Sequence, residues 1–149
     1  MRVVSVKFGE LDVPEETVLD FPAGIFGFPQ LRRCCLLPYG GPSGLRWIQS
    51  LDDPILLFLS VEPHAVFPEY EAEIPDSEAQ ALDLQTAEDA AILTLVTVCP
   101  DTKTVSANLL APLVINMKTR QARQVLLDPD RYATRHVIGG ENLVLGSER

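Results

Sequence analysis

The stretch 105–127 constrains the fold of this chain more than any other. Two apolar runs, 105–110 and 113–115, flank Pro112, and a polar break separates them from a third run at 121–127. Short apolar runs bounded by turn residues are typical of antiparallel strands. Pro112 has no N–H to donate to a sheet, so the chain must bend, bulge or change its strand partner there. The stretch therefore predicts an antiparallel sheet that is interrupted at this proline.

The rest of the chain repeats this pattern of short apolar runs, and the twelve prolines lie mostly between the runs. The first run, 3–8, alternates Val4, Val6 and Phe8 with a second set of side chains, as a half-buried strand does. The further runs that we expect to form strands are 11–13, 17–21, 34–37, 45–51, 55–61 and 90–98. We expect 45–61 to be a hairpin and 90–98, which is almost continuously apolar, to be a central strand.

The pattern predicts a mainly β, single-domain antiparallel β-barrel-like fold with one or two short helices. A short helix is expected after Pro75, with Asp76 able to cap it. We expect 131–138 to form a turn or one helical turn. Gly139-Gly140 is expected to separate the domain, 1–138, from a mobile tail, 139–149.

Residues 21–29 are expected to form a loop that packs down on one end of the barrel. They include two prolines and two glycines, which disfavour a regular element, and three phenylalanines, which favour packing. A loop that contacts a ligand is the alternative interpretation.

An acidic segment, 62–89, holds nine Asp and Glu residues and no Lys or Arg. Within it, Glu69, Glu71 and Glu73 alternate with apolar residues. On a strand, this alternation would place three carboxylates on the exposed face at a spacing of about 6.5–7 Å. The segment suits a basic partner protein, although charge that serves solubility alone is the plainer interpretation.

Composition argues against several classes of function. A net charge of −9 disfavours direct nucleic-acid binding. No apolar run reaches the roughly 18 residues that a membrane span needs, and no signal peptide is recognised, so we expect a cytoplasmic protein. Three cysteines without a pairing pattern (Cys34, Cys35 and Cys99) are expected to be small buried hydrophobes.

The sequence contains no pattern typical of catalysis or metal binding. His64 and His136 are the only histidines, and neither lies at a known catalytic spacing. No phosphate-binding loop, nucleophile elbow or zinc-type Cys/His spacing occurs. We therefore expect no catalytic residue, no metal and no cofactor.

Six motifs in order resemble the flagellar assembly factor FliW family over residues 2–136. They are Lys7-Phe8-Gly9-Glu10, the 21–28 loop, the Trp47–Pro54 hairpin, Phe67-Pro68-Glu69-Tyr70, the 107–116 stretch, and the pair Arg123-Gln124-Val125 with Tyr132 to His136. The resemblance implies a small cytoplasmic β-barrel-like protein that is not an enzyme. It implies two protein partners, the carboxyl-terminal region of flagellin and the RNA-binding translational regulator CsrA.

The resemblance also suggests where these partners would bind. CsrA must present basic surface to RNA, so we expect it to contact the acidic residues Glu69, Glu71, Glu73 and Asp76. The terminal segments of flagellin are amphipathic and helix-forming and need an apolar groove. The candidate aromatic contacts are Phe26, Phe28, Phe67 and Tyr70.

Two alternatives remain open from the sequence. One is a small β-barrel enzyme or ligand carrier with a pocket under the 21–29 loop. The other is an acidic RNA mimic that competes directly for the RNA-binding surface of the regulator.

Overall fold

The computed structural model describes residues 1–39 and 44–140. Its strands are β1 (Arg2–Ser5), β2 (Gly9–Asp12), β3 (Val18–Asp20), β4 (Arg33–Pro38), β5 (Leu45–Ser50), β6 (Leu57–Val61), β7 (Ala90–Cys99), β8 (Thr104–Ala107), β9 (Leu113–Asn116), β10 (Ala122–Gln124) and β11 (His136–Gly140). Its helices are α1 (Pro63–Val66) and α2 (Asp76–Ala81), with single 3-10 turns at η1 (Glu15–Thr17) and η2 (Ala87–Asp89). The expected mainly β, antiparallel fold with two short helices is confirmed.

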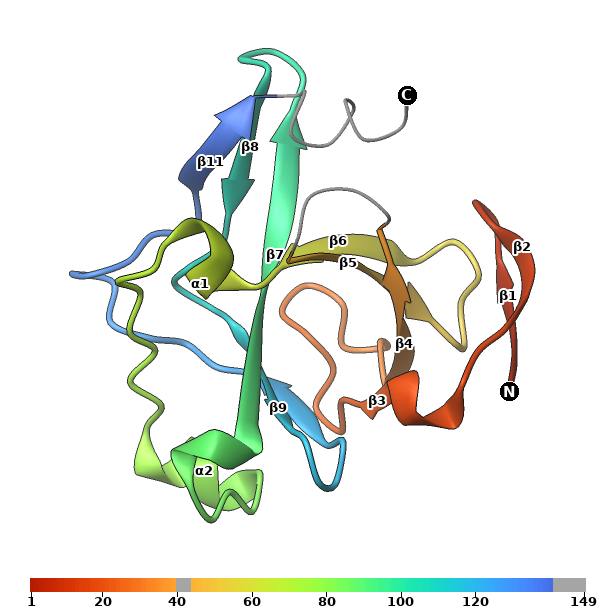
Figure 1. Ribbon diagram of the computed structural model, residues 1–149, viewed down its shortest axis with the longest axis horizontal. Helices are drawn as coiled ribbons and strands as arrows, with labels where there is room; N and C mark the ends of the chain where they lie inside the picture. Colours follow the sequence, from red (N-terminus) through yellow and green to blue (C-terminus); the bar gives the residue numbers. More distant parts are fainter. Residues whose placement is uncertain (40–43, 141–149) are drawn as a thin grey trace.

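The main sheet runs in the order β10-β9-β7-β6-β5-β4-β3 and curls into a barrel-like body. Its two edge strands approach each other at a single bridge between Asp20 and Gln121, so the barrel is not fully closed. Figure 1 shows β7 running through the length of the body, with β8 and β11 beside its upper end and the β1–β2 hairpin on the opposite flank. The sheet carries two main apolar clusters, one on each side of the central strands.

The interruption expected at Pro112 is a large bulge. On one edge of β7, Ala107 pairs with Val96 and Leu113 pairs with Leu93. Five residues on the β8–β9 side therefore lie opposite two on β7, and the loop 108–112 projects from the ladder. The chain bulges here because a proline cannot donate to the strand it faces.

Several other expectations are confirmed, with shifted ends. The 45–61 hairpin is β5 and β6, and the central strand is β7. The run expected at 121–127 is a strand only over β10. Its last residues instead bond to the bulge, where Val125 N–H donates to Pro112 O (2.9 Å) and Leu127 N–H donates to Leu110 O (2.8 Å).

Three local expectations are wrong. The run expected at 3–8 is not a single strand, because β1 ends at Ser5 and the chain turns at 6–8. The hairpin of β1 and β2 buries Val3, while Val4 is 52% exposed. Anchoring of Val3 against the Val13–Cys35 cluster decides which face of this strand is inward. Asp76 lies inside the first turn of α2 and makes no capping hydrogen bond, because Pro75 occupies the N-cap position.

The third error is at the C-terminal end. The segment 131–138 does not form a helical turn. Instead β11 pairs with β8 and continues through Gly139 and Gly140, opposite Val105 and Thr104. The two glycines thus extend the sheet, and the remaining tail, 141–149, lies outside the described residues.

Candidate functional site

The acidic segment 62–89 runs along one flank of the body, from α1 through α2 to η2 (Figure 1). The stretch 69–74, whose alternation was considered as that of a strand, joins no sheet in the described part of the chain. Its side chains nevertheless alternate, with Tyr70 buried and Ala72 partly buried. The outward direction of the three glutamates is as expected, and all are exposed: Glu69, Glu71 and Glu73.

Two tyrosines, rather than pairing with a neighbouring strand, fix the position of the stretch 69–74. Tyr70 is 4% exposed, and its hydroxyl donates to Leu109 O at 2.8 Å. Its ring packs edge-on against Tyr132 at 4.9 Å, and the Tyr132 hydroxyl accepts from the N–H of Glu71 (3.1 Å) and donates to its carbonyl (3.0 Å). Burial raises the pKa of the Tyr70 phenol, with a smaller contribution from Tyr132. Tyr70 is therefore a buried anchor rather than an exposed contact.

Cations from the C-terminal part of the chain pair with the acidic segment. Arg131 contacts Glu73 at 3.1 Å and Glu71 at 3.7 Å. The Nε of Arg123 donates to Glu78 at 2.7 Å, and this hydrogen bond raises the pKa of the guanidinium. These pairs join α2 and the extended stretch to residues some 45 to 60 positions away in the sequence.

The segment keeps an excess of negative charge after this pairing. Its nine carboxylates meet four cations from elsewhere in the described chain: Arg46, Lys118, Arg123 and Arg131. Carboxylates thus outnumber cations by five. Of the four residues expected to meet a basic partner, Glu69 and Asp76 form no ion pair with any residue of 1–39 or 44–140.

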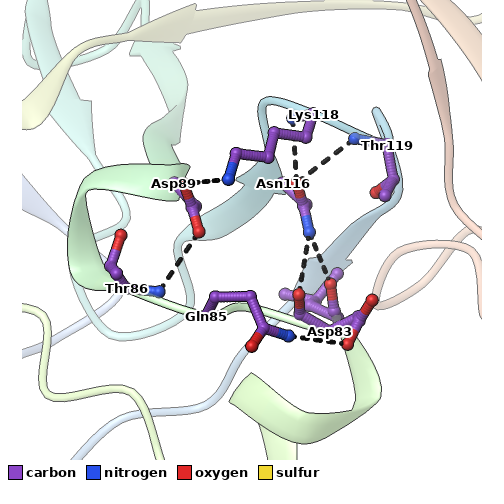
Figure 2. Close-up of polar contacts among 8 residues, drawn as sticks. Asp83, Gln85, Thr86, Asp89, Asn116, Lys118 and Thr119 are labelled. Atoms are coloured by element: carbon purple, nitrogen blue, oxygen red, sulfur yellow. Dashed lines mark hydrogen bonds and ion pairs between the residues drawn. The ribbon is translucent and has the colours of Figure 1, made fainter.

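Asn116, at the end of β9, fixes the other end of the segment to the sheet (Figure 2). It is 2% exposed, and its Nδ2 donates to Leu82 O at 2.8 Å and to Asp83 O at 3.3 Å. Its Oδ1 accepts from the N–H groups of Lys118 (2.9 Å) and Thr119 (3.2 Å). One amide therefore ties the end of α2 to the β9–β10 turn.

Asp89 makes a second link beside Asn116 (Figure 2). Its carboxylate pairs with Lys118 Nζ at 3.3 Å and accepts from the N–H of Thr86 at 3.2 Å, and its carbonyl accepts from the N–H of Met117 at 2.8 Å. Desolvation acts to raise the pKa of Asp89, but the hydrogen bonds from Lys118 and Thr86 outweigh it, so this pKa is lowered. The carboxylate therefore stays charged and holds the lysine.

The four aromatic candidates do not form one surface. Phe26 is 58% exposed at the tip of the 21–29 loop, whereas Phe28 is partly buried edge-on against Phe58 at 5.0 Å. Phe67 is also partly buried and belongs with Tyr70 to the other apolar cluster. Phe26 is therefore the one member of the set that presents most of its side chain.

The 21–29 loop packs down on the barrel, as expected. Gly24 has φ +69°, and an added Cβ would lie 2.5 Å from Pro29 O, so only glycine fits. The N–H of Phe26 donates to Gln124 Oε1 at 2.7 Å, which fastens the tip to β10. Two of its apolar side chains are buried: Phe21 and Ile25.

A groove of about 830 Å³ opens elsewhere on the body. Its lining includes the apolar residues Leu19, Leu36 and Ile115 and charged side chains, among them Glu62 and Arg120. No residue of 21–29 lines it, so it is not the pocket under that loop suggested by the sequence.

Comparison with known proteins identifies the family. The sequence model described as FliW protein matches residues 2–138. The chain belongs to the FliW family. It is 42% identical over 136 residues to "Flagellar assembly factor FliW" of Heliobacterium modesticaldum, covering 91% of this chain and 89% of that protein. The FliW protein of Bacillus subtilis is 33% identical over 141 residues, covering 94% and 99%.

The fold is that of FliW as well. A crystal structure of the flagellar assembly factor FliW superposes with a TM-score of 0.83 at 30% identity, covering 95% of this chain and 99% of that one. None of the helices in residues 1–39 and 44–140 has the length and apolar composition needed to cross a bilayer. A role in flagellar assembly follows from the family.

Both histidines of this FliW-family protein make hydrogen bonds with the backbone. His64 Nε2 lies 2.9 Å from Tyr70 O, and His136 Nε2 accepts from the N–H of Ala133 at 2.8 Å. Within the described ranges, no three His, Cys, Asp or Glu side chains are grouped so as to hold a metal ion.

The cysteines fit the expected burial only in part. Cys34 and Cys35 are buried, and desolvation raises the pKa of both thiols. Cys99 is partly exposed, and a hydrogen bond from Thr102 lowers its pKa.

Sequence reasoning missed the residues that hold the acidic segment. Asn116, Arg123, Arg131 and Tyr132 were noticed only as part of motifs or of an expected turn. The available signal was that Asn116 and Tyr132 lie in motifs that resemble FliW but outside any apolar run, where packing in the core does not explain them.

Proposed function

We propose that this FliW-family protein acts in the cytoplasm by binding two proteins, flagellin and the translational regulator CsrA, and that it catalyses no reaction. When flagellin is scarce, the free protein holds CsrA and relieves repression of flagellin translation. When flagellin accumulates, it takes the protein and releases CsrA. Such a switch requires two sites whose occupancy is coupled.

The observation that supports the CsrA half is the geometry of the acidic segment. Its carboxylates outnumber their cations by five, and the stretch carrying Glu69, Glu71 and Glu73 is held by Tyr70 and Tyr132. A fixed cluster of exposed carboxylates attracts a basic surface and loses little entropy on docking. Among these carboxylates, Glu69 and Asp76 can pair with a partner's cations without first breaking an ion pair within the described chain.

The flagellin half is supported by the groove and by Phe26. Glu62 belongs to the acidic segment and also lines the groove, so the two candidate sites adjoin. A segment that displaces Glu62 would disturb both sites. Phe26 offers an exposed ring on a fixed loop, the type of residue that anchors many protein interfaces.

Charge reversal at the free carboxylates tests the CsrA half. We expect the double variant Glu69→Lys, Asp76→Lys to bind purified CsrA about tenfold more weakly at low salt, and with a smaller salt dependence. A matched double variant, Glu10→Lys with Asp101→Lys, changes the same net charge on other surfaces and is expected to bind normally. Equal affinities for the two double variants would reject the acidic site.

An RNA competition experiment separates the proposal from direct mimicry. If the protein imitates RNA, rising concentrations of CsrA-bound RNA should displace it competitively. We expect the displacement of this protein from CsrA to level off as RNA is added, because its acidic segment would contact CsrA beside the RNA-binding surface of CsrA rather than on it. Strict competition would favour the mimic.

A further inference from the structure

The lower half of β7 has one edge without a strand partner. Residues 90–93 pair with β9 on one edge, whereas on the other edge β6 ends at Val61, which pairs with Thr94. The chain then turns away into α1. No described strand continues β6 alongside 90–93.

The groove follows this free edge. All four consecutive residues of 90–93 line it. Successive side chains of a strand point to opposite faces, so a hollow that touches all four includes both faces of β7 at this edge. Ile115 of β9 also lines it, so the hollow continues over the face that β7 shares with β9. Leu19 of β3 and Leu36 of β4 also line it.

An extended peptide fits this edge better than a helix does. A strand edge presents N–H and C=O groups that need hydrogen-bond partners. The backbone groups of a helix are already bonded to one another, whereas an extended segment offers donors and acceptors at the spacing of β7. Four residues of edge correspond to roughly 13 Å of strand.

The lining of the groove also supplies a cation. Arg120 lines the groove, and its Nη1 donates to Glu15 O at 2.9 Å, but it forms no ion pair with any carboxylate in the described ranges. Its backbone has φ +61°, a region in which glycine is less strained than arginine. A guanidinium with unused donors favours a carboxylate on the occupant.

We propose that an apolar, extended segment of the carboxyl-terminal region of flagellin adds to β7 as a strand in this groove, with an acidic residue of the segment on Arg120. The identity of the partner rests on the proposed function, whereas the binding mode comes from the free edge. Sequence analysis expected a groove for a helix, and the unpaired edge argues for a strand instead. The aromatic residues of the 21–29 loop do not line this groove, so Phe26 would make a separate contact with flagellin.

The test compares two glycine variants in the full chain. Arg120→Gly removes the guanidinium and relieves the positive φ. Lys103→Gly is the matched control, because Lys103 is an exposed cation with φ +55° in the β7–β8 turn, outside the groove lining. Thermal unfolding is expected to show both variants at least as stable as the parent, so a loss of binding by Arg120→Gly would not reflect misfolding.

Binding is measured by calorimetry with purified flagellin, and amide exchange is followed with and without it. We expect Arg120→Gly to bind flagellin at least about tenfold more weakly than the parent, and Lys103→Gly to bind within twofold of the parent. We also expect the amides of 90–93 to exchange more slowly in the complex. Normal binding by Arg120→Gly together with unchanged exchange at 90–93 would overturn the groove assignment and leave the proposed function standing. If the parent protein binds no flagellin at all, the proposed function and this inference both fail.

Discussion

Replacement of Asn116 by alanine should unfold the protein at markedly lower denaturant concentration. The side chain is 2% exposed and makes four hydrogen bonds of 2.8–3.3 Å. Each such bond contributes about 1 kcal/mol net, and loss of one partner leaves the other buried and unpaired. We therefore expect Asn116→Ala to lower the free energy of unfolding by about 3 kcal/mol, a large part of the 5–15 kcal/mol typical of a domain.

Urea unfolding followed by the fluorescence of Trp47, the single tryptophan, measures this change. With a slope of about 2 kcal/mol per molar urea, the midpoint should fall by roughly 1.5 M. Asn108→Ala is the matched control, since Asn108 Oδ1 accepts one hydrogen bond, from Ala111 N–H at 3.0 Å. The control should lose about 1 kcal/mol.

Two outcomes would refute the reasoning. Equal midpoints for the two asparagine variants would show that Asn116 is no special link. A stability loss without faster amide exchange at 82–89 would show that the acidic segment is held by other contacts.

Two further predictions concern the loop and the buried tyrosine. Gly24→Ala should lower the free energy of unfolding by more than about 2 kcal/mol, because the added Cβ would lie 2.5 Å from Pro29 O. Gly27→Ala, with φ +84° and open space around the residue, should cost only about 1 kcal/mol of backbone strain. Equal losses of the two variants in urea unfolding would contradict this. Burial raises the pKa of Tyr70 above its ordinary value of 10.0, so the folded state holds the phenolic proton more tightly than the unfolded state and stability should fall as pH rises above about 10. Tyr70→Phe should show a smaller fall over the same range, and an unchanged pH profile would exclude Tyr70 as its source.

The sequence predicts those elements whose local pattern and tertiary partners agree. The apolar run 90–98 becomes the long strand β7, and the hairpin expected over 45–61 is formed by β5 and β6. The interruption expected at Pro112 appears as a bulge because proline lacks a donor whatever surrounds it. These signals can be predicted because they depend on the local sequence and not on distant contacts.

Other elements depend on contacts that a local pattern does not contain. Residues 69–74 alternate like a strand, but no neighbour offers them a ladder, and Tyr132, 61 positions away, satisfies the backbone of Glu71 instead. The stretch 131–138 carries no clear strand signal, and β11 forms because β8 presents a free edge. In both cases tertiary pairing overrides local preference.

The candidate site divides in the same way. The outward direction of Glu69 and its neighbours follows from alternation and could be predicted. The burial of Tyr70 could not be predicted from the sequence, because its hydroxyl can be buried only where it donates to the carbonyl of Leu109 on the distant bulge. The free edge of β7 is a property of strand order, which the sequence alone does not specify.

The central claim is that this FliW-family protein works by binding other proteins. Size-exclusion chromatography of the purified protein, mixed first with CsrA, then with flagellin, then with both, tests it most directly. We predict co-elution with each partner alone, and release of CsrA when flagellin is added in excess. Elution of the protein by itself in all three mixtures would contradict the account.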